Sequence, residues 1–217
     1  MPHALIPLTL VENEQLKPRL HRLTFTADAF AEYTLSGPDE YFGLLMPQRG
    51  QPFTPFAVNG FNIRAAISAL PGHIRPELRW YTIRAHNPAA RTIDVDVVTH
   101  GDSGPGSRWI RNARPGDSAG MFTCPALWTP PIASQVLVAD ASALPALRHI
   151  LGYQSVNAPD ALRETDVVAV VTSGDEVEDG LADEWGDRLR SLTVTHTDKG
   201  AETAAALSAL RLSLIHI

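Results

Sequence analysis

The hydrophobic pattern of the chain changes its period near Thr129-Pro130-Pro131, and this change constrains the fold more than any other feature. Before it, short segments alternate apolar and polar residues, which is typical of strands with one buried face. After it, short apolar runs are separated by segments with helical spacing, and this order implies a parallel sheet with right-handed crossovers. The sequence therefore predicts a β-barrel domain over residues 1–130, followed by a small α/β domain over residues 131–211.

The first part is expected to form an antiparallel barrel. Strands are predicted over residues 21–26, 41–46, 79–84 and 91–99. In the last of these, Ile93, Val95 and Val97 share one face and are expected in the core. Asp94 and Asp96 point the other way and are expected to face water. Turn residues recur between the strands at 37–39, 71–72 and 115–117, a spacing typical of antiparallel barrels.

The second part is expected to alternate strands and helices. Strands are predicted over residues 135–139, 166–171 and 192–195, and helices over 142–151, 181–189 and 203–210. Ser142 is the predicted cap of the first helix. The acidic run 175–179, together with Asp183 and Glu184, is expected to be a solvated surface.

The last six residues, 212–217, have an unusual sequence. They match the peptide encoded by a transposon end sequence used in preparing DNA sequencing libraries, so we expect them to be an adapter artefact and the natural protein to continue past Arg211. A genuine final apolar strand is the alternative. Three parallel strands are few for a domain of this class, since sheets average about 5 to 6 strands, so the α/β domain is expected to be truncated.

Composition excludes several classes of function. The 217 residues include 18 basic and 24 acidic side chains, and the net charge of −6 argues against a nucleic-acid partner. The longest apolar runs are strand-sized, whereas a membrane helix needs about 20 apolar residues, so no membrane insertion is expected. The N-terminus lacks a signal-peptide pattern, and a single cysteine, Cys124, cannot form an internal disulfide. We therefore expect a cytoplasmic protein, and we expect a monomer.

No metal site or hydrolase site is expected. The eight histidines share no metal-ligand spacing, and Gly-x-Ser-x-Gly does not occur. Cys124 is interpreted as an inert packing thiol, because no base accompanies it in the sequence.

The segment Arg79-Trp80-Tyr81-Thr82-Ile83-Arg84 is the first that carries chemistry. In a strand, Arg79 and Tyr81 share one face about 7 Å apart. A guanidinium binds phosphate through several donors, and a phenol ring can lie along a flat ligand. Thr82 offers a hydroxyl to a ring heteroatom. A chance pattern, with Tyr81 packed across strands, is the alternative.

The second such segment runs from Val97 to Trp109. A strand leads into a loop rich in glycine, and Ser107 is predicted to open a short helix. A helix N-terminus presents free N–H groups and a positive dipole end, so this loop is a candidate cradle for a diphosphate. An ordinary capped surface loop is the alternative.

Several motifs in order resemble the siderophore-interacting protein family, flavin-dependent ferric-siderophore reductases of the ferredoxin-NADP reductase-like superfamily. The resemblance covers residues 18 to 211. The motifs are Gly37-Pro38-Asp39-Glu40-Tyr41, Arg79-x-Tyr81-Thr82-x-Arg84, Asp96-x-x-x-His100-Gly101, Gly104-Pro105-x-Ser107-x-Trp109, Pro115-Gly116-Asp117 and Ala139-Asp140-x-x-Ala143-Leu144-Pro145-Ala146. The chain departs from the family pattern at Ala141, where an acidic residue is usual, and over residues 123–127.

The resemblance implies an FAD-binding Greek-key barrel and an NAD(P)H-binding α/β domain. It implies that Arg79 binds an FAD phosphate, that Tyr81 lies along the flavin and ribityl region, and that Thr82 lies near flavin N5. Further residues implied for FAD are His100 and Gly101 at the flavin and Gly104, Pro105, Gly106 and Ser107 at the pyrophosphate. For the nicotinamide cofactor they are Asp140, Ser142 and Ala143, with residues 173–175 near its adenosine. Trp109 and Ile110 are interpreted as core.

The activity implied is electron transfer from NAD(P)H through FAD to a ferric siderophore, with release of Fe(II). No side chain is assigned as catalytic, and Thr82 is the candidate to test. Two alternatives stay open: a flavin or ferredoxin-type reductase with another acceptor, and a flavin-binding module without turnover. A ferric chelate is favoured if basic residues lie beside the flavin, and the candidates are Arg64, Arg75, Arg84 and Arg108.

Overall fold

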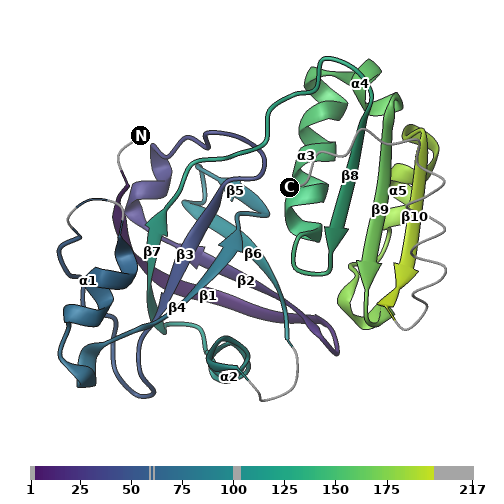
Figure 1. Cartoon of the computed structure of the whole chain (residues 1–217). Coiled ribbons are helices and arrows are strands. Elements are labelled where there is room, and N and C mark those ends of the chain that lie inside the picture. The colour runs from purple at the N-terminus through teal and green to yellow at the C-terminus, as the bar shows by residue number, and fades with distance from the viewer. Residues whose placement is uncertain (1–2, 59, 61, 100–103, 198–217) are drawn as a thin grey trace.

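The computed structural model describes residues 3–58, 60, 62–99 and 104–197, and these form two sheets (Figure 1). The larger sheet is antiparallel and curls into a half-barrel, with the strand order β4-β3-β7-β1-β2-β6-β5. Its strands are β1 (Leu5–Lys17), β2 (Leu20–Thr26), β3 (Tyr41–Met46), β4 (Glu77–Thr82), β5 (Ala85–Asn87), β6 (Thr92–Val98) and β7 (Ser118–Thr123). We call this sheet and its helices the barrel part.

Short helices accompany the half-barrel. They are η1 (Asp28–Ala31), α1 (Ile63–Ala69), η2 (Gly72–Ile74) and α2 (Pro105–Asn112). Figure 1 shows α2 at one end of the curled sheet, where Ile110 is fully buried in the barrel core. The alternating apolar residues of the strands fill that core, among them Leu23, Phe25, Leu44, Ile93 and Val95, as the period of two requires.

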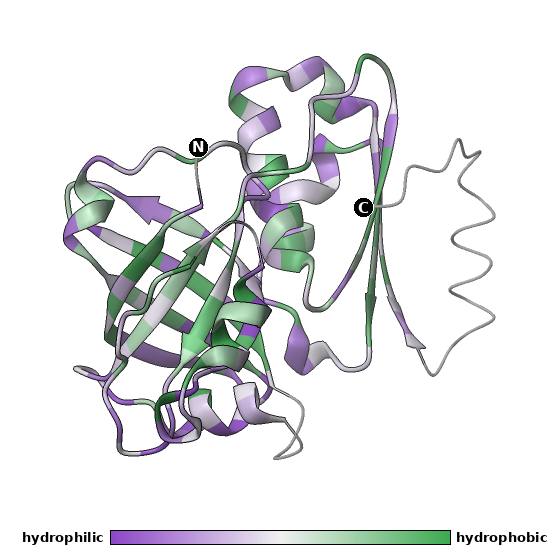
Figure 2. Ribbon diagram, turned by 60° about the vertical axis from the view of Figure 1, so that its left-hand side comes forward, coloured by the Kyte–Doolittle hydropathy of each residue, from purple (hydrophilic) through white to green (hydrophobic). Residues whose placement is uncertain are grey.

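The smaller sheet is parallel, in the order β10-β9-β8. Its strands are β8 (Gln135–Asp140), β9 (Thr165–Val171) and β10 (Ser191–His196), and its helices are α3 (Leu144–Asn157), α4 (Pro159–Arg163), η3 (Gly174–Glu176), α5 (Leu181–Trp185) and η4 (Gly186–Arg188). The central strand β9 is buried on both faces, which explains its continuous apolar run. Figures 1 and 2 show α3 between this sheet and the half-barrel. We call this region the α/β part.

The predicted architecture is confirmed, since an antiparallel curled sheet precedes a small parallel one. Ile93, Val95 and Val97 are buried as predicted. The predicted strand 41–46 has the observed bounds of β3. The predicted helix over 203–210 and the suspected artefact over 212–217 lie outside the described residues.

Several local predictions are wrong. β4 ends at Thr82 rather than at Arg84, because the next two amide groups bond elsewhere: Ile83 N donates to Glu40 O (3.0 Å) and Arg84 N to Asp94 O (2.8 Å). The predicted helix 181–189 is two short helices, α5 and η4.

The predicted solvent-facing charges are wrong in four places. Asp94 is half-buried and accepts a hydrogen bond from Thr24 Oγ1 (2.8 Å). The other three are Asp96, which is 7 % exposed, Glu176, which is 1 % exposed, and Glu178, which is half-buried. The physical reason for the last three is that the two parts of the chain pack together here, so Asp96, Glu176 and Glu178 are paired with arginines of the barrel part instead of water. Asp183 and Glu184 are exposed as predicted, although Glu184 pairs with Arg148.

Within the described residues, none of the helices is both long enough and apolar enough to cross a membrane. The Cys124 thiol is buried, and this burial raises its pKa. A thiol in this state is a poor nucleophile.

Candidate functional site

Two segments that are 25 residues apart in the sequence meet at the end of the half-barrel. Strand β4 carries Arg79 and Tyr81, and helix α2 begins beside it at Pro105. A Cβ atom placed on Gly106 would lie 3.0 Å from Tyr81 Oη and 3.3 Å from Arg79 Cγ. The first turn of α2 therefore contacts both side chains, and glycine at this position allows the close approach.

The N-terminus of α2 is built without a side-chain cap. Gly104 is its N-cap residue in extended conformation, and Pro105 occupies the first turn. The first intrahelical bond is from Arg108 N to Gly104 O (3.0 Å). The N–H groups of Gly106 and Ser107 precede that bond and have no acceptor within the helix. The prediction that Ser107 opens the helix is wrong, because proline suits the first turn better.

The two side chains of β4 have complementary character. The exposed Arg79 donates from Nη1 to Leu78 O (2.7 Å), and no carboxylate within the described segments forms an ion pair with it. Burial raises the pKa of Tyr81 to about 12, although the nearby Arg79 charge acts in the opposite direction. Tyr81 is therefore a neutral phenol whose O–H can donate.

Thr82 lies where the barrel meets the α/β part. It is the last residue of β4 and pairs with Tyr41 of β3. The next residue, Ile83, accepts a hydrogen bond at its carbonyl oxygen from His149 Nδ1 of α3 (3.0 Å). The end of β4 is thus attached directly to the first helix of the α/β part.

Two grooves flank the start of β4. The larger, of about 820 Å³, lies between residues 46–52 and α2, and Arg108 and Trp109 line it. The smaller, of about 400 Å³, is lined by Arg64, Arg75 and Arg79. Glu77 borders both grooves, whereas Tyr81 and Thr82 line neither.

The prediction that Ile110 and Trp109 are core residues is confirmed for Ile110 and only in part for Trp109. Ile110 is fully buried. Trp109 is half-buried: one side stacks on Phe25, with ring centroids 6.4 Å apart, and it also borders the larger groove.

The loop after β8 is organised by Asp140. Its Oδ1 accepts from Ser142 N (2.9 Å), Ser142 Oγ (2.7 Å) and Ala143 N (3.0 Å). Ala143, not Ser142, is the N-cap residue of α3, so the predicted cap is wrong: the aspartate two residues upstream already bonds the amides. These residues lie at the carboxyl end of a parallel strand, the edge where ligands approach such sheets.

The four arginines considered as candidates to attract a ferric chelate have different surroundings. Arg84 forms ion pairs with Asp96 (3.6 Å) and Glu178 (3.4 Å), so it is part of the structure between the two parts. Arg75 donates to the carbonyl oxygens of Ser68 and Leu70 (2.9 Å each). Of these four arginines, Arg108 lines the larger of the two grooves described above, and Arg64 and Arg75 line the smaller.

Some residues of the predicted site cannot be placed. His100 and Gly101 lie outside the described residues. Over the parts of the chain that the structure describes, no group of three or more His, Cys, Asp or Glu side chains is arranged to hold a metal ion.

The sequence analysis missed the ion-pair network around Arg84. The partners of Arg84 are Asp96 and Glu178, and Glu178 also pairs with Arg22 of β2 and Arg148 of α3 between the two parts. Their separations in the sequence, such as 156 positions between Arg22 and Glu178, leave no local pattern that could have revealed them.

A curled antiparallel sheet followed by a small parallel sheet is a fold shared with the ferredoxin-NADP+ reductase from Plasmodium falciparum, which matches with a TM-score of 0.59 and 12% identity, covering 90% of this chain and 74% of that one. A family model for the siderophore-interacting FAD-binding domain matches residues 9–126, more than half of the chain. The chain belongs to this family.

Individual relatives agree with this assignment. The chain is 28% identical over 148 residues to the mycobactin import ATP-binding/permease protein IrtA of Mycolicibacterium smegmatis, covering 66% of this chain and 15% of that protein. It is 28% identical over 151 residues to the ferric vibriobactin reductase ViuB of Vibrio cholerae, covering 64% and 55%. The crystal structure of the siderophore-interacting protein SipS from Aeromonas hydrophila matches with a TM-score of 0.68 and 26% identity, covering 98% of this chain and 75% of SipS. The chain thus spans 15% of IrtA and about half of ViuB.

Proposed function

We propose that this chain is a flavin-dependent reductase that passes electrons from NAD(P)H through FAD to a ferric siderophore. The observation that carries the proposal is the contact of Gly106 with Arg79 and Tyr81, because it places a cation, a neutral phenol and a helix N-terminus around one point. The family membership supports the same cofactor.

The residues present fit FAD. The Arg79 guanidinium, which has no carboxylate partner within the described segments, would bind the pyrophosphate with the N–H groups of Gly106 and Ser107. Gly104 and Pro105 shape the turn that exposes those groups. Tyr81 would lie along the flavin and ribityl region, and the Thr82 hydroxyl would face the ring edge near N5.

When bound, FAD can accept a hydride from a nicotinamide and release single electrons to Fe(III). The protein's own contribution is placement. β4 positions Tyr81 and Thr82 on a rigid strand. The loop of Asp140, Ser142 and Ala143 lies at the strand end where a nicotinamide cofactor would approach.

A ferric siderophore is the proposed substrate because the matching family model is that of a siderophore-interacting domain and the relative ViuB is named a ferric vibriobactin reductase. In a chain with a net charge of −6, the groove bordered by Arg64, Arg75 and Arg79 is a local concentration of positive charge, which attracts an anionic chelate. Reduction releases the metal because hard oxygen ligands bind Fe(II) more weakly than Fe(III).

The test begins with FAD titration of the purified chain, followed by anaerobic addition of NADH or NADPH. We expect bleaching of the flavin, and NAD(P)H oxidation that is faster with a ferric siderophore as acceptor, with formation of Fe(II), than with free flavin or ferredoxin as acceptor. Bleaching with a preference for another acceptor would support a general reductase. Bound flavin that no nicotinamide bleaches would support a binding module without turnover.

Arg79→Ala tests the site itself. Loss of a charge-assisted bond is expected to weaken FAD binding by about 1.5 to 3 kcal/mol. Arg64→Ala is the matched control, since Arg64 borders the same groove from α1, and it should retain wild-type FAD affinity. Equal FAD affinity of Arg79→Ala and the wild type would remove Arg79 from the site.

A further inference from the structure

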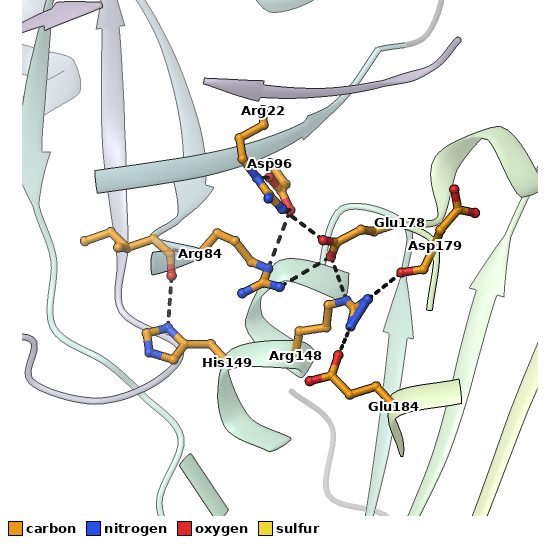
Figure 3. A network of polar contacts seen from close by, with 9 residues as sticks. Arg22, Arg84, Asp96, Arg148, His149, Glu178, Asp179 and Glu184 are labelled. Carbon is orange, nitrogen blue, oxygen red and sulfur yellow. Dashed lines mark hydrogen bonds and ion pairs between the residues drawn. The ribbon is translucent and has the colours of Figure 1, made fainter. Parts of the chain in front are cut away.

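We propose that Glu178 is a positioning residue for electron transfer: its carboxylate joins the α/β part to the strand that carries Tyr81 and Thr82, and so sets the distance between nicotinamide donor and flavin. The inference rests on the proposed function. It concerns the ion-pair network drawn in Figure 3, which is separate from the residues assigned to FAD.

Three arginines from three elements converge on Glu178 (Figure 3). The contacts are Arg148 Nε at 2.7 Å, Arg22 Nη2 at 3.1 Å and Arg84 Nη2 at 3.4 Å. Arg22 belongs to β2 and Arg84 follows β4, whereas Arg148 belongs to α3. A single carboxylate in the loop before α5 therefore contacts both parts of the molecule.

Two further carboxylates complete the network. Asp96 accepts two bonds from Arg22 (2.7 and 2.9 Å) and lies 3.6 Å from Arg84 Nε. Arg148 also binds Glu184 at 2.8 Å. Three positive and three negative groups thus compensate one another. The Arg148 and Asp96 side chains are only 6 % and 4 % exposed, so loss of one partner leaves charges that water cannot readily solvate.

Glu178 is ionised in this setting. Burial alone would raise its pKa, but the charges of Arg148, Arg84 and Arg22 outweigh burial and lower the pKa below its usual value. The carboxylate therefore holds the three arginines together at neutral pH.

The network is connected to the proposed reaction path at both ends. On the flavin side, Arg84 is two residues after Thr82, and the intervening Ile83 accepts the His149 hydrogen bond. On the donor side, α3 starts directly after the Asp140 loop. Arg148 lies about 6 Å along the helix axis from Leu144, at a rise of 1.5 Å per residue. A rigid helix thus links the loop expected to approach the donor with the end of β4.

A purely stabilising role would have a different signature. Glu178 belongs to none of the apolar clusters that form the cores of the two parts, whereas its arginine partners come from both parts. Its loss should therefore loosen the apposition of the two parts more than it unfolds either. A displacement of about 1 Å between reacting groups costs up to about 100-fold in rate.

The test compares Glu178→Gln with Asp183→Asn, an exposed carboxylate on the neighbouring helix α5. With FAD bound, we expect flavin reduction by NAD(P)H to slow on the order of tenfold in Glu178→Gln. FAD affinity and the rate of reduction by dithionite, which needs no nicotinamide site, should match those of the wild type. Glu178→Asp, which keeps the charge on a shorter side chain, should recover part of the rate. Asp183→Asn should behave as the wild type throughout.

A second readout needs no cofactor. In calorimetry of the flavin-free chain, we expect one unfolding transition for the wild type and Asp183→Asn, and two for Glu178→Gln, because the two parts no longer unfold together. If Glu178→Gln does not accumulate, Glu178→Asp serves in its place. Wild-type reduction rates together with a single transition in the Glu178 variant would overturn the inference. Failure of the wild type to bind FAD or to react with a nicotinamide would instead overturn the proposed function, and the calorimetry would still decide the role of Glu178.

Discussion

Gly106 is the position where one added methyl group tests the candidate site. A Cβ there would lie 3.0 Å from Tyr81 Oη and 3.3 Å from Arg79 Cγ, so at least one of these side chains must move. Because α2 can otherwise accommodate alanine, we expect Gly106→Ala to weaken FAD binding several-fold with a change in unfolding free energy of about 1 kcal/mol or less. Fluorescence titration with FAD measures the affinity, and thermal unfolding measures the stability.

The matched control for this substitution lies in the middle of α3. Gly152→Ala meets no atom within 4 Å, so it should leave FAD affinity unchanged and raise stability by about 0.5 to 1 kcal/mol through helix propensity. Wild-type FAD affinity in Gly106→Ala would contradict the placement of the pyrophosphate at this helix start.

His149 lies where the barrel part and the α/β part meet, and its protonation makes the stability of the protein depend on pH. Burial, the largest influence, lowers its pKa, and Arg84 lowers it further, whereas the Ile83 carbonyl and the carboxylates Asp39 and Glu40 act in the opposite direction. In the folded protein the imidazole therefore stays neutral at a pH where the unfolded chain already binds a proton. Stability is complete above about pH 6.5 and falls as the pH drops below that value.

We expect the wild type to lose more unfolding free energy than His149→Gln between about pH 7.5 and 5.5. At pH 5.5, one unit below the usual histidine pKa of about 6.5, the difference can reach at most about 1.4 kcal/mol. Denaturant titrations at the two pH values measure it. Burial also lowers the pKa of His21. Because His21 is present in both proteins, its contribution cancels when their pH profiles are compared. Parallel pH profiles of the two proteins would show that His149 does not titrate with folding.

At the scale of elements, the hydrophobic period was sufficient to predict four strands of the half-barrel and the three strands of the parallel sheet, whereas β1, β5 and β7 were not predicted. The alternation of Ile93, Val95 and Val97 and the apolar run of β9 reflect burial on one face and on two faces, and both are visible in the sequence. The contact between β4 and α2 was expected from residue chemistry, because an arginine and a glycine-rich helix start are both suited to a phosphate, and Gly106 does lie beside Arg79.

The charged joint between the two parts could not be predicted in this way. The residues 175–179 have the composition of a solvated loop, and local pattern does not distinguish a carboxylate that faces water from one that faces arginines. Asp96 is similar, because it alternates with core residues and yet is covered by another part of the chain. Such pairings depend on how whole elements pack, which is tertiary information.

β7 provides a prediction at this scale. Gly120 lies opposite Leu45 of β3, and a Cβ there would collide with the ring of Phe53. Phe53 belongs to the apolar cluster between the sheet and α1. We expect Gly120→Ala to destabilise the protein by about 1 to 3 kcal/mol through overpacking, measured by denaturant unfolding.

The control for Gly120→Ala is Gly72→Ala, at an exposed glycine where an added Cβ meets no atom within 4 Å. Its unfolding free energy should stay within about 0.5 kcal/mol of the wild type. Equal stability of Gly120→Ala and Gly72→Ala would show that the Phe53 ring moves aside at no cost.

For the molecule as a whole, the segment that connects β7 to β8 is more exposed than the contacts between the barrel part and the α/β part. Leu127 is 69 % exposed and Ile132 is fully exposed. The start of the connection is held by the barrel, since Asp39 accepts hydrogen bonds from Leu127 N and Trp128 N. Within the described chain, residues 131–134 form no hydrogen bond to the barrel part, so proteolysis is expected there first.

Cleavage of the peptide chain near Ile132 should therefore leave the two parts bound to each other by noncovalent contacts. The ion pairs around Glu178, the pairs of Lys17 with Asp179 (2.6 Å) and Arg19 with Glu176 (3.2 Å), and the His149 bond would still join them. Because much of this joint is electrostatic, its strength depends on ionic strength, with a screening length of about 10 Å at 0.1 M salt and about 3 Å at 1 M. We expect the two fragments to elute together in gel filtration at low salt and apart at about 1 M salt. Fragments that stay together at high salt would show that apolar contacts, such as Val98 against the α/β core, hold the two parts and that the charges only orient them.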